Sequence, residues 1–322
     1  MLRGGPRGLV IQLALLAAVA LVVALLAGNV AANLQRLGVK TGFGFLERPA
    51  GFDISQTLIS YGEQSTYLTA FVVALLNTLL VTALASTLAT IIGFTVGIGR
   101  LSSNRVVAAA SGLYVETFRN IPLLIQLLFW YFAVLRPLPG PRQSLNLGDL
   151  VFLNNRGLFI PWPRLGDGSL ISWSIPHLEG FNFSGGVAMT PELFALTLGL
   201  TIYSAAYIAE IVRSGVQAIP RGQIEAARSL GLSRWQIIRM IEIPLALRII
   251  VPPLGAYYVI LLKNTSLGSA IAYPDLMHVF AGTVLNQTGQ PVEVMLITLA
   301  TYLGLGLIIS GATSALNRWL RR

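Results

Sequence analysis

Long uncharged stretches alternate with short charged segments along the chain. Leu9 to Ala27 is an apolar run interrupted only by Gln12, and Gln64 to Gly99 contains no charged residue. Because about 20 helical residues cross a hydrocarbon core of roughly 30 Å, each run predicts a membrane-spanning helix. The same criterion selects residues 106–135, 192–212, 249–262 and 294–316. The pattern therefore predicts an all-α membrane protein with about six transmembrane helices.

Composition supports this interpretation and removes several kinds of chemistry. Of the 322 residues, 54% are hydrophobic and 11% are charged, against about 25% charged in an average soluble domain. The chain has no cysteine and two histidines, His177 and His278, which excludes disulfides, thiol nucleophiles and a multi-histidine metal site. The net charge of +9 does not indicate nucleic-acid binding, because the basic residues lie beside apolar runs.

The basic residues also predict how the chain is oriented in the membrane. If successive runs alternate sides, most of the 22 lysine and arginine residues fall on the side of the N-terminus. Cytoplasmic segments carry such an excess, so we expect a multi-pass inner-membrane protein with both termini in the cytoplasm. The first run could instead be a cleaved signal peptide, but it is longer than the usual apolar core of about 7–15 residues.

Polar segments divide the chain into parts. Residues 1–63 are expected to form an N-terminal transmembrane helix and an external segment, and residues 64–322 the main helical core. Within that core, residues 136–191 are rich in Pro, Gly, Asn and Trp, which favours an ordered external loop or a small cap. Residues 219–244 form a cytoplasmic segment between the fourth and fifth runs.

The cytoplasmic segment carries clear local signals. Pro220 suits the first turn of a helix, and Gly231 suits a left-handed stop. Ser233 followed by Gln236 predicts a capping box for a second helix, which Pro244 would end. The segment therefore predicts two short helices about a glycine elbow. On physical grounds alone, such a pair could insert into a groove of another protein or lie on anionic lipid.

The same segment resembles a known signature. Glu225-Ala226-Ala227, Gly231, Ile241 and Ile243-Pro244 follow the spacing of the Glu-Ala-Ala loop of binding-protein-dependent importer permeases, with Ile243 in place of the usual leucine. The resemblance implies a type I ABC importer permease-like core of five helices plus an extra N-terminal helix. In that family the loop is a coupling helix that docks into a cleft on the ATPase subunit. The coupling residues implied are Gly222, Glu225, Ala226, Ala227, Gly231, Ile241 and Pro244.

The resemblance also implies separate roles within the loop. Gly231 would be a rigid elbow, Ala226 and Ala227 would pack, and Glu225 would anchor the loop through a charged hydrogen bond. Two further stretches narrow the subfamily. Phe118 to Pro122, with the aromatic run that follows, resembles polar amino acid permeases, and Phe152 to Leu158 resembles the permeases of broad-specificity L-amino acid importers.

The expected division of labour places ATP hydrolysis on another chain. The sequence has no G-x-x-x-x-G-K-[ST] loop, so we expect a permease that is not itself an enzyme and carries no cofactor of its own. ATP and Mg would be bound by separate ABC ATPase subunits. A periplasmic solute-binding protein and a second, homologous permease complete the expected assembly, and a non-identical second permease is favoured over a homodimer.

A few polar residues within the runs are candidates for the solute pathway. Arg119 and Glu210 could meet the carboxylate and the ammonium of an amino acid, and Asn264, Thr265 and Ser266 could line the pathway or a gate. Structural alternatives are a pair between Glu116 and Arg119, a pair between Glu210 and Arg213, and simple capping at residues 264–266. An ion-gradient-driven secondary transporter or channel for small polar solutes is the rival function. A membrane-embedded enzyme is disfavoured, because the sequence lacks the clusters of residues that such an enzyme needs.

Overall fold

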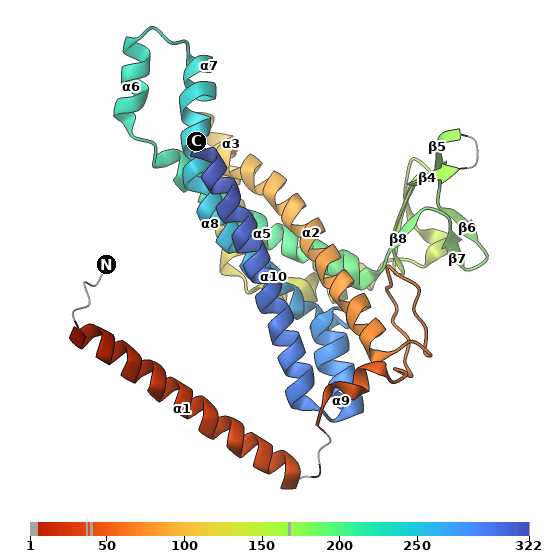
Figure 1. Cartoon of the computed structure of the whole chain (residues 1–322). Helices are drawn as coiled ribbons and strands as arrows, with labels where there is room; N and C mark the ends of the chain where they lie inside the picture. The colour runs from red at the N-terminus through yellow and green to blue at the C-terminus, as the bar shows by residue number, and fades with distance from the viewer. Residues whose placement is uncertain (1–5, 37, 39–40, 167–168, 322) are drawn as a thin grey trace.

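The computed structural model describes residues 6–36, 38, 41–166 and 169–321, and most of them are helical (Figure 1). Five helical segments are long and apolar enough to cross a membrane, or six if a bent pair counts as one span, within this described part of the chain. The main helices are α1 (Pro6–Arg36), α2 (Tyr67–Gly99), α3 (Arg105–Asn120), α4 (Leu123–Leu128), α5 (Pro191–Gln217), α8 (Ile243–Asn264) and α10 (Pro291–Leu320). The predicted helical class is confirmed, and the predicted number of about six spans is reached when the bent pair counts as one span.

Helices α2 and α5 form the central pair of the bundle. Two glycines of α2, one turn apart, make their close approach possible. A Cβ atom at Gly93 would lie 2.6 Å from the side chain of Ile208, and one at Gly97 would lie 2.7 Å from the carbonyl oxygen of Ala209. Small residues at this spacing let two membrane helices approach backbone to backbone. The Gly93–Gly97 pair therefore fixes where α5 crosses α2.

The third predicted span, residues 106–135, is not one straight helix. Its two parts, α3 and the segment Leu123–Leu135, bend by 100° at Ile121–Pro122, so the predicted run folds as a bent pair of helices. Pro122 has no N–H to donate, which breaks the helical ladder. The side chain of Gln126 donates to the carbonyls of Phe118 and Ile121, both at 2.9 Å, and so satisfies groups that the break leaves free.

The fifth span is longer than expected. The short helix α7 (Arg234–Ile237) runs through a π-helical stretch, η4 (Ile238–Glu242), directly into α8, so Pro244 does not end a helix as predicted. Pro244 lies in the first turn of α8, where a missing N–H costs little. The chain therefore forms one continuous helical segment from Arg234 to Ile271, including the 3-10 turn η5 (Thr265–Ile271).

Polar residues of α2 connect that helix to the segment after α8. The side-chain amide of Asn77 donates to the carbonyl of Pro274 at 2.9 Å. The backbone carbonyl of Asn77 accepts from the Tyr273 hydroxyl at 3.0 Å. Thr78 accepts from the backbone of Leu276, the first residue of η6 (Leu276–Val284), at 3.0 Å. Such interhelical hydrogen bonds stabilise helix packing in membranes. A short helix, α9 (Leu285–Thr288), then leads towards α10.

The N-terminal part divides into two pieces with different surroundings. None of the apolar window of α1 is buried, and the helix lies apart from the bundle (Figure 1). By contrast, the segment that follows packs on the core: Phe45 of η1 (Phe43–Glu47), Ala50 and Ile54 are buried against α2 and η6. The segment from Phe43 to Ile54 therefore packs with the main helical core.

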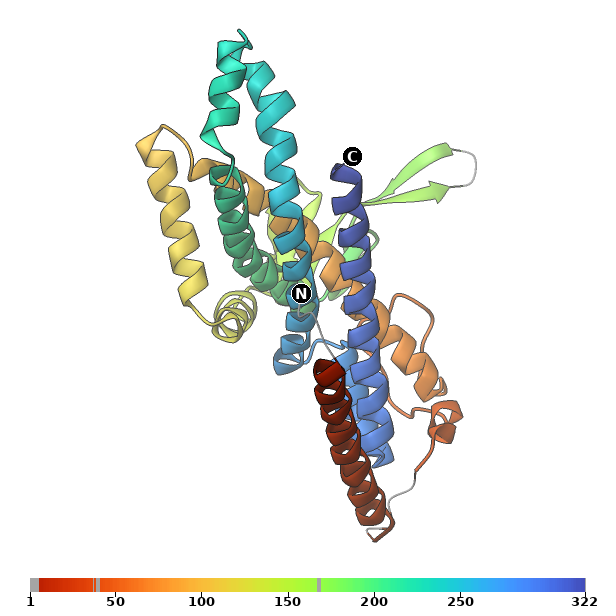
Figure 2. The ribbon, with the colours of Figure 1, turned by 60° about the vertical axis from the view of Figure 1, so that its left-hand side comes forward.

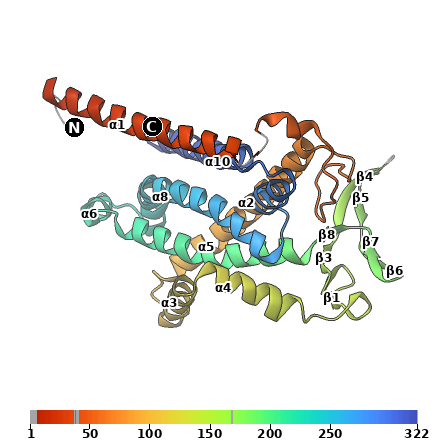
Figure 3. The same ribbon diagram turned by 90° about the horizontal axis from the view of Figure 1, so that it is seen from below.

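The insertion between α4 and α5 is a β structure, which the all-α prediction missed. An antiparallel sheet of order β1-β2-β3-β8 carries two projecting hairpins, β4–β5 and β6–β7. We call this unit the β-cap, and it lies at the opposite end of α5 from α6 and α7 (Figures 1 and 3). Its strands are β1 (Leu145–Leu147), β2 (Val151–Asn154), β3 (Gly157–Ile160), β4 (Trp162–Gly166), β5 (Ser169–Ser174), β6 (His177–Glu179), β7 (Asn182–Ser184) and β8 (Val187–Met189), preceded by η3 (Pro141–Gln143).

Candidate coupling helix pair and polar pocket

The segment between α5 and α8 folds as the predicted pair of helices about a glycine elbow. Helix α6 spans Arg221–Ser229, and Gly231, two residues after it, has a left-handed φ of 77°. Leu232 donates to the carbonyl of Ala227 at 3.2 Å, and Gly231 donates to Arg228 at 2.9 Å. These two bonds form the Schellman arrangement, in which glycine is the residue that adopts φ > 0 without strain. The predicted elbow is confirmed.

The start of α7 is closed by the predicted capping box. The backbone of Ser233 donates to the Gln236 side chain at 2.8 Å, and the backbone of Gln236 donates to the Ser233 hydroxyl at 3.4 Å. Arg234 and Glu242 form an ion pair of 2.6 Å that joins α7 to η4. Both ends of the elbow are thus held by local bonds, so α6 and α7 keep a defined angle.

Most of the predicted coupling residues on this helix pair are exposed. The pair stands beyond the ends of the other helices (Figures 1 and 2). Ala227 is buried, whereas Gly222, Glu225 and Ala226 are exposed. The carboxylate of Glu225 forms no ion pair or hydrogen bond with any residue in the described part of the chain. Ile241 and Pro244 are half-buried at the base of the pair. Their predicted roles stay predictions.

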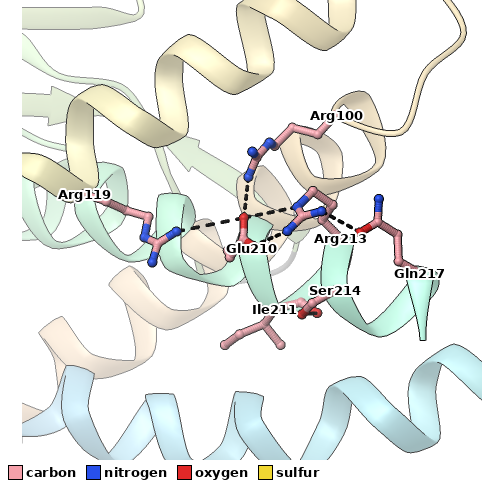
Figure 4. A network of polar contacts seen from close by, with 7 residues as sticks. All are labelled: Arg100, Arg119, Glu210, Ile211, Arg213, Ser214 and Gln217. Carbon is pink, nitrogen blue, oxygen red and sulfur yellow. Dashed lines mark hydrogen bonds and ion pairs between the residues drawn. The ribbon is translucent and has the colours of Figure 1, made fainter.

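A polar pocket lies between α2, α3 and α5. Glu210 of α5 forms ion pairs with Arg100, which follows α2, and with Arg213, one turn further along α5 (Figure 4). Arg119 at the end of α3 brings its Nη1 to 3.9 Å from the Glu210 carboxylate. The cavity beside them has a volume of about 380 Å³. It is lined by Arg100, Val115, Glu116, Arg119, Asn120, Tyr207 and Glu210.

The arginine side chains around Glu210 are not equivalent. Arg100 and Arg213 are held tightly, while the side chain of Arg119 is 39% exposed and lies over the Tyr207 ring at 5.0 Å. Arg213 also donates to Gln217, which fixes it along α5. The predicted structural pair of Glu210 with Arg213 is therefore confirmed, and Arg119 remains the cation most open to the cavity. Such a guanidinium over an aromatic face is held by cation–π attraction.

Two sequence-based expectations about this region need correction. Glu116 and Arg119 form no ion pair in the described residues, because Arg119 turns towards Glu210 instead. Arg100 was not singled out as a site residue, although it lies directly after the long apolar run of α2. A lone arginine at the end of a span is the only local signal that could have drawn attention to it.

The remaining pathway candidates lie away from this pocket. Asn264 is the last residue of α8, and Thr265 and Ser266 begin η5. The hydroxyl of buried Thr265 donates to the Leu262 carbonyl at 2.8 Å, and that of Ser266 donates to Lys263 at 2.7 Å. These bonds agree with the capping interpretation of the hydroxyls. None of the three residues lines the cavity around Glu210.

Comparison with known proteins identifies the family. Residues 89–322 match the family model of the binding-protein-dependent transport system inner membrane component. The chain belongs to this family. The match includes the coupling-loop signature and the whole polar pocket, so the geometry described above lies within the part that the family shares. Membership displaces the rival prediction of an ion-gradient-driven transporter or channel.

Relatives of this inner membrane component cover nearly the whole chain. The "Putative amino-acid ABC transporter permease protein YhdX" of Escherichia coli K12 is 44% identical, with 97% of this chain and 93% of that protein covered. The general L-amino acid transport system permease protein AapQ of Rhizobium johnstonii is 38% identical, with 88% and 84% covered. A solved amino acid ABC transporter, crystallised with histidines, matches with a TM-score of 0.57 and 27% identity over 78% of this chain and 94% of that one.

A second solved structure, the MetNI methionine ABC transporter in an inward-facing conformation, matches with a TM-score of 0.53 and 22% identity. It covers 79% of this chain and 98% of that one, and at this identity it supports the fold alone. The type I permease-like core predicted from the coupling-loop resemblance is thus confirmed.

Proposed function

We propose that this inner membrane component is the permease subunit of an ABC importer that carries polar L-amino acids into the cell. The α6–Gly231–α7 pair carries the proposal, because it is a rigid, basic projection whose exposed carboxylate and small side chains have no partner in the described part of the chain. Amino acid transport is supported by the names of the relatives over most of the chain's length.

The proposed orientation places α6 and α7 and both termini in the cytoplasm, and the β-cap outside. Four arginines in or beside the pair support this orientation through the positive-inside rule. They are Arg221, Arg228, Arg234 and Arg239.

In the proposed mechanism the α6–α7 pair transmits the movement of the ATPase to the membrane-spanning helices. ATP and Mg are bound by separate ABC ATPase subunits, and this chain needs no cofactor of its own. Ala226 and Glu225 would enter a cleft on the ATPase, where the carboxylate gains a hydrogen-bond partner. Movement of α6 passes into α5 at Gln217, and movement of α7 passes directly into α8, because the two are continuous. Closure of the ATPase pair would thereby tilt the spans.

The polar pocket is the proposed place of contact with the solute. Arg119 is exposed to the cavity and suits the carboxylate of an amino acid. Glu116 and the Tyr207 ring, which also line the cavity, suit its ammonium. Glu210, engaged by its arginines, would then position the site and not bind solute itself. Asn264, Thr265 and Ser266 stay a proposed gate near the far end of α8.

The proposed assembly has three kinds of partner. Two ATPase subunits would dock on the cytoplasmic side and a solute-binding protein on the external side. A second permease, homologous but not identical, would pair in the membrane. Apolar side chains of α10 such as Leu299, Leu303 and Leu307 are more than 60% exposed, so they need lipid or another helix to cover them.

Reconstitution tests the proposal directly. The complete importer in proteoliposomes, supplied with ATP inside and binding protein outside, should accumulate a radiolabelled amino acid. Gly231→Pro, which cannot adopt φ > 0, and Glu225→Lys should both abolish uptake while the chain remains in the membrane. Gly231→Asn, which tolerates the left-handed conformation, should retain uptake. Normal uptake by the proline variant would refute the coupling role.

A further inference from the structure

Among its described residues, the β-cap exposes eight large apolar side chains. Most other exposed apolar side chains lie on the helices, where lipid can cover them. The cap lies at the end of the bundle, and contiguous apolar patches on a wet surface mark interaction sites. The exposed apolar residues of the cap are Leu145, Leu147, Leu150, Trp162, Trp173, Ile175, Leu178 and Phe181.

The hairpin β4–β5 is the clearest case. In its register Trp162 faces Ser174, and Pro163 faces Trp173. Because successive residues of a strand alternate between faces, the two tryptophans project from opposite faces of the same ribbon. They are 52% and 64% exposed, and within the described residues neither ring stacks on another aromatic. A two-stranded ribbon with a bare tryptophan on each face is marginally stable alone.

The tip of the second hairpin, β6–β7, presents another exposed aromatic. Phe181 is 72% exposed. The guanidinium of Arg142 lies 4.6 Å from its ring centroid, and Arg156 donates to its carbonyl at 3.1 Å. Tryptophan, other aromatic residues and arginine are the residue types that dominate binding energy at protein interfaces. The two exposed hairpins therefore have the residue types that are typical of protein interfaces.

Beneath these hairpins the cap is firmly built and joined to α5. The rings of Phe152 and Phe159 each pack against Phe183, at 4.6 and 4.9 Å between centroids. Strand β8 leads through Thr190 straight into α5, and Thr190 caps that helix. Tyr131 donates to Glu192, in the first turn of α5, at 2.6 Å. A load on the cap would thus reach the helix that carries Glu210 and continues to α6.

We propose that the hairpins β4–β5 and β6–β7 are the docking surface for the solute-binding protein that the family description names. This inference rests on the proposed function and its orientation. A flat lipid surface can cover only one face of a ribbon, whereas a groove between two lobes of a protein can cover both. A second permease would pair along the apolar helices of the bundle, whereas the cap lies beyond the end of α5, opposite α6 and α7 (Figure 1).

The test uses the complete importer in nanodiscs and the purified solute-binding protein of the same system. Trp162→Ala combined with Trp173→Ala should weaken binding of the solute-loaded protein at least tenfold, measured by biolayer interferometry. Trp319→Ala is the matched control, because this tryptophan is 69% exposed at the opposite end of the bundle and its loss should leave binding unchanged. Size-exclusion profile and thermal unfolding report whether each variant is folded and assembled.

Because the chain has no cysteine, a single Ser172→Cys gives a unique thiol on β5 for a photo-cross-linker. It should capture the binding protein, whereas Ser314→Cys on α10 should not. Wild-type binding by the folded double tryptophan variant, or cross-linking only to lipid or to the second permease, would overturn the inference. If the binding protein stimulates ATP hydrolysis of the wild-type importer in the same samples, that failure leaves the proposed function intact. Absent stimulation would refute the function itself.

Discussion

Two glutamates of this chain have opposite surroundings. Glu210 lies inside the bundle, where Arg100, Arg213 and Arg119 surround its carboxylate. Glu225 lies on the projecting pair α6–α7, where it is exposed and its carboxylate has no partner in the described residues. A carboxylate in or near hydrocarbon must find cations within its own chain, because unpaired charge is costly there. A carboxylate that faces water is solvated without a partner and stays available for one on another chain. The comparison separates a carboxylate that is paired within the chain from the exposed one that we propose to dock on the ATPase.

Removing each carboxylate should give the largest contrast. Glu210→Ala leaves closely packed arginines facing one another, and we expect a loss of about 1–3 kcal/mol in stability, less than for a fully buried pair because the side chain is 27% exposed. Glu225→Ala should leave thermal unfolding unchanged but reduce solute-stimulated ATP hydrolysis roughly tenfold or more. Thermal unfolding in detergent and ATPase assays of the assembled importer measure both. Equal stability losses would contradict the comparison.

Within the pocket, Arg119 and Arg213 should separate binding from stability. Arg119→Ala removes the exposed cation, so the solute concentration for half-maximal uptake should rise about tenfold, equivalent to about 1.4 kcal/mol. Arg213→Ala should mainly lower the unfolding temperature, because this guanidinium is engaged by Glu210 and Gln217. Uptake kinetics and thermal unfolding of both variants provide the measurement. An unchanged half-maximal concentration for the Arg119 variant would remove it from the pathway.

The neighbouring alanines of α6 offer a smaller and matched contrast. Ala227 is 2% exposed near the elbow, so Ala227→Leu overpacks its buried site and should cost about 1–3 kcal/mol. Ala226 is exposed, so Ala226→Leu should leave unfolding unchanged and weaken association with the ATPase severalfold. Copurification of the ATPase with each variant reads out the second effect. Stable ATPase association of the Ala226 variant would indicate that the docking face lies elsewhere.

Local features of the fold could be predicted from the sequence. Apolar runs such as 64–99 predicted spans, because crossing a bilayer requires a fixed length of apolar helix. The Gly231 elbow and the Ser233–Gln236 capping box were also foreseen, since each depends on residues a few positions apart. The predictions failed where a proline has two possible outcomes. Pro122 bends the predicted run 106–135 into two helices, a bend that was not predicted, while Pro244, predicted to end a helix, is absorbed into the first turn of one.

The β-cap shows a different limit. Its strands are mostly three to six residues long, too short for an alternating pattern to stand out within a segment rich in Pro and Gly. Only the pairing of strands distant in sequence, such as β3 with β8, defines the sheet.

Sequence alone determined which segments enter the membrane and where the elbow lies, because apolar length, left-handed glycine and capping act within one helix. Tertiary structure alone decided which charges from different helices meet. Arg100 and Glu210 are 110 positions apart. They come together because Gly93 and Gly97 allow α2 to lie directly against α5, and no periodicity within either helix specifies that neighbour.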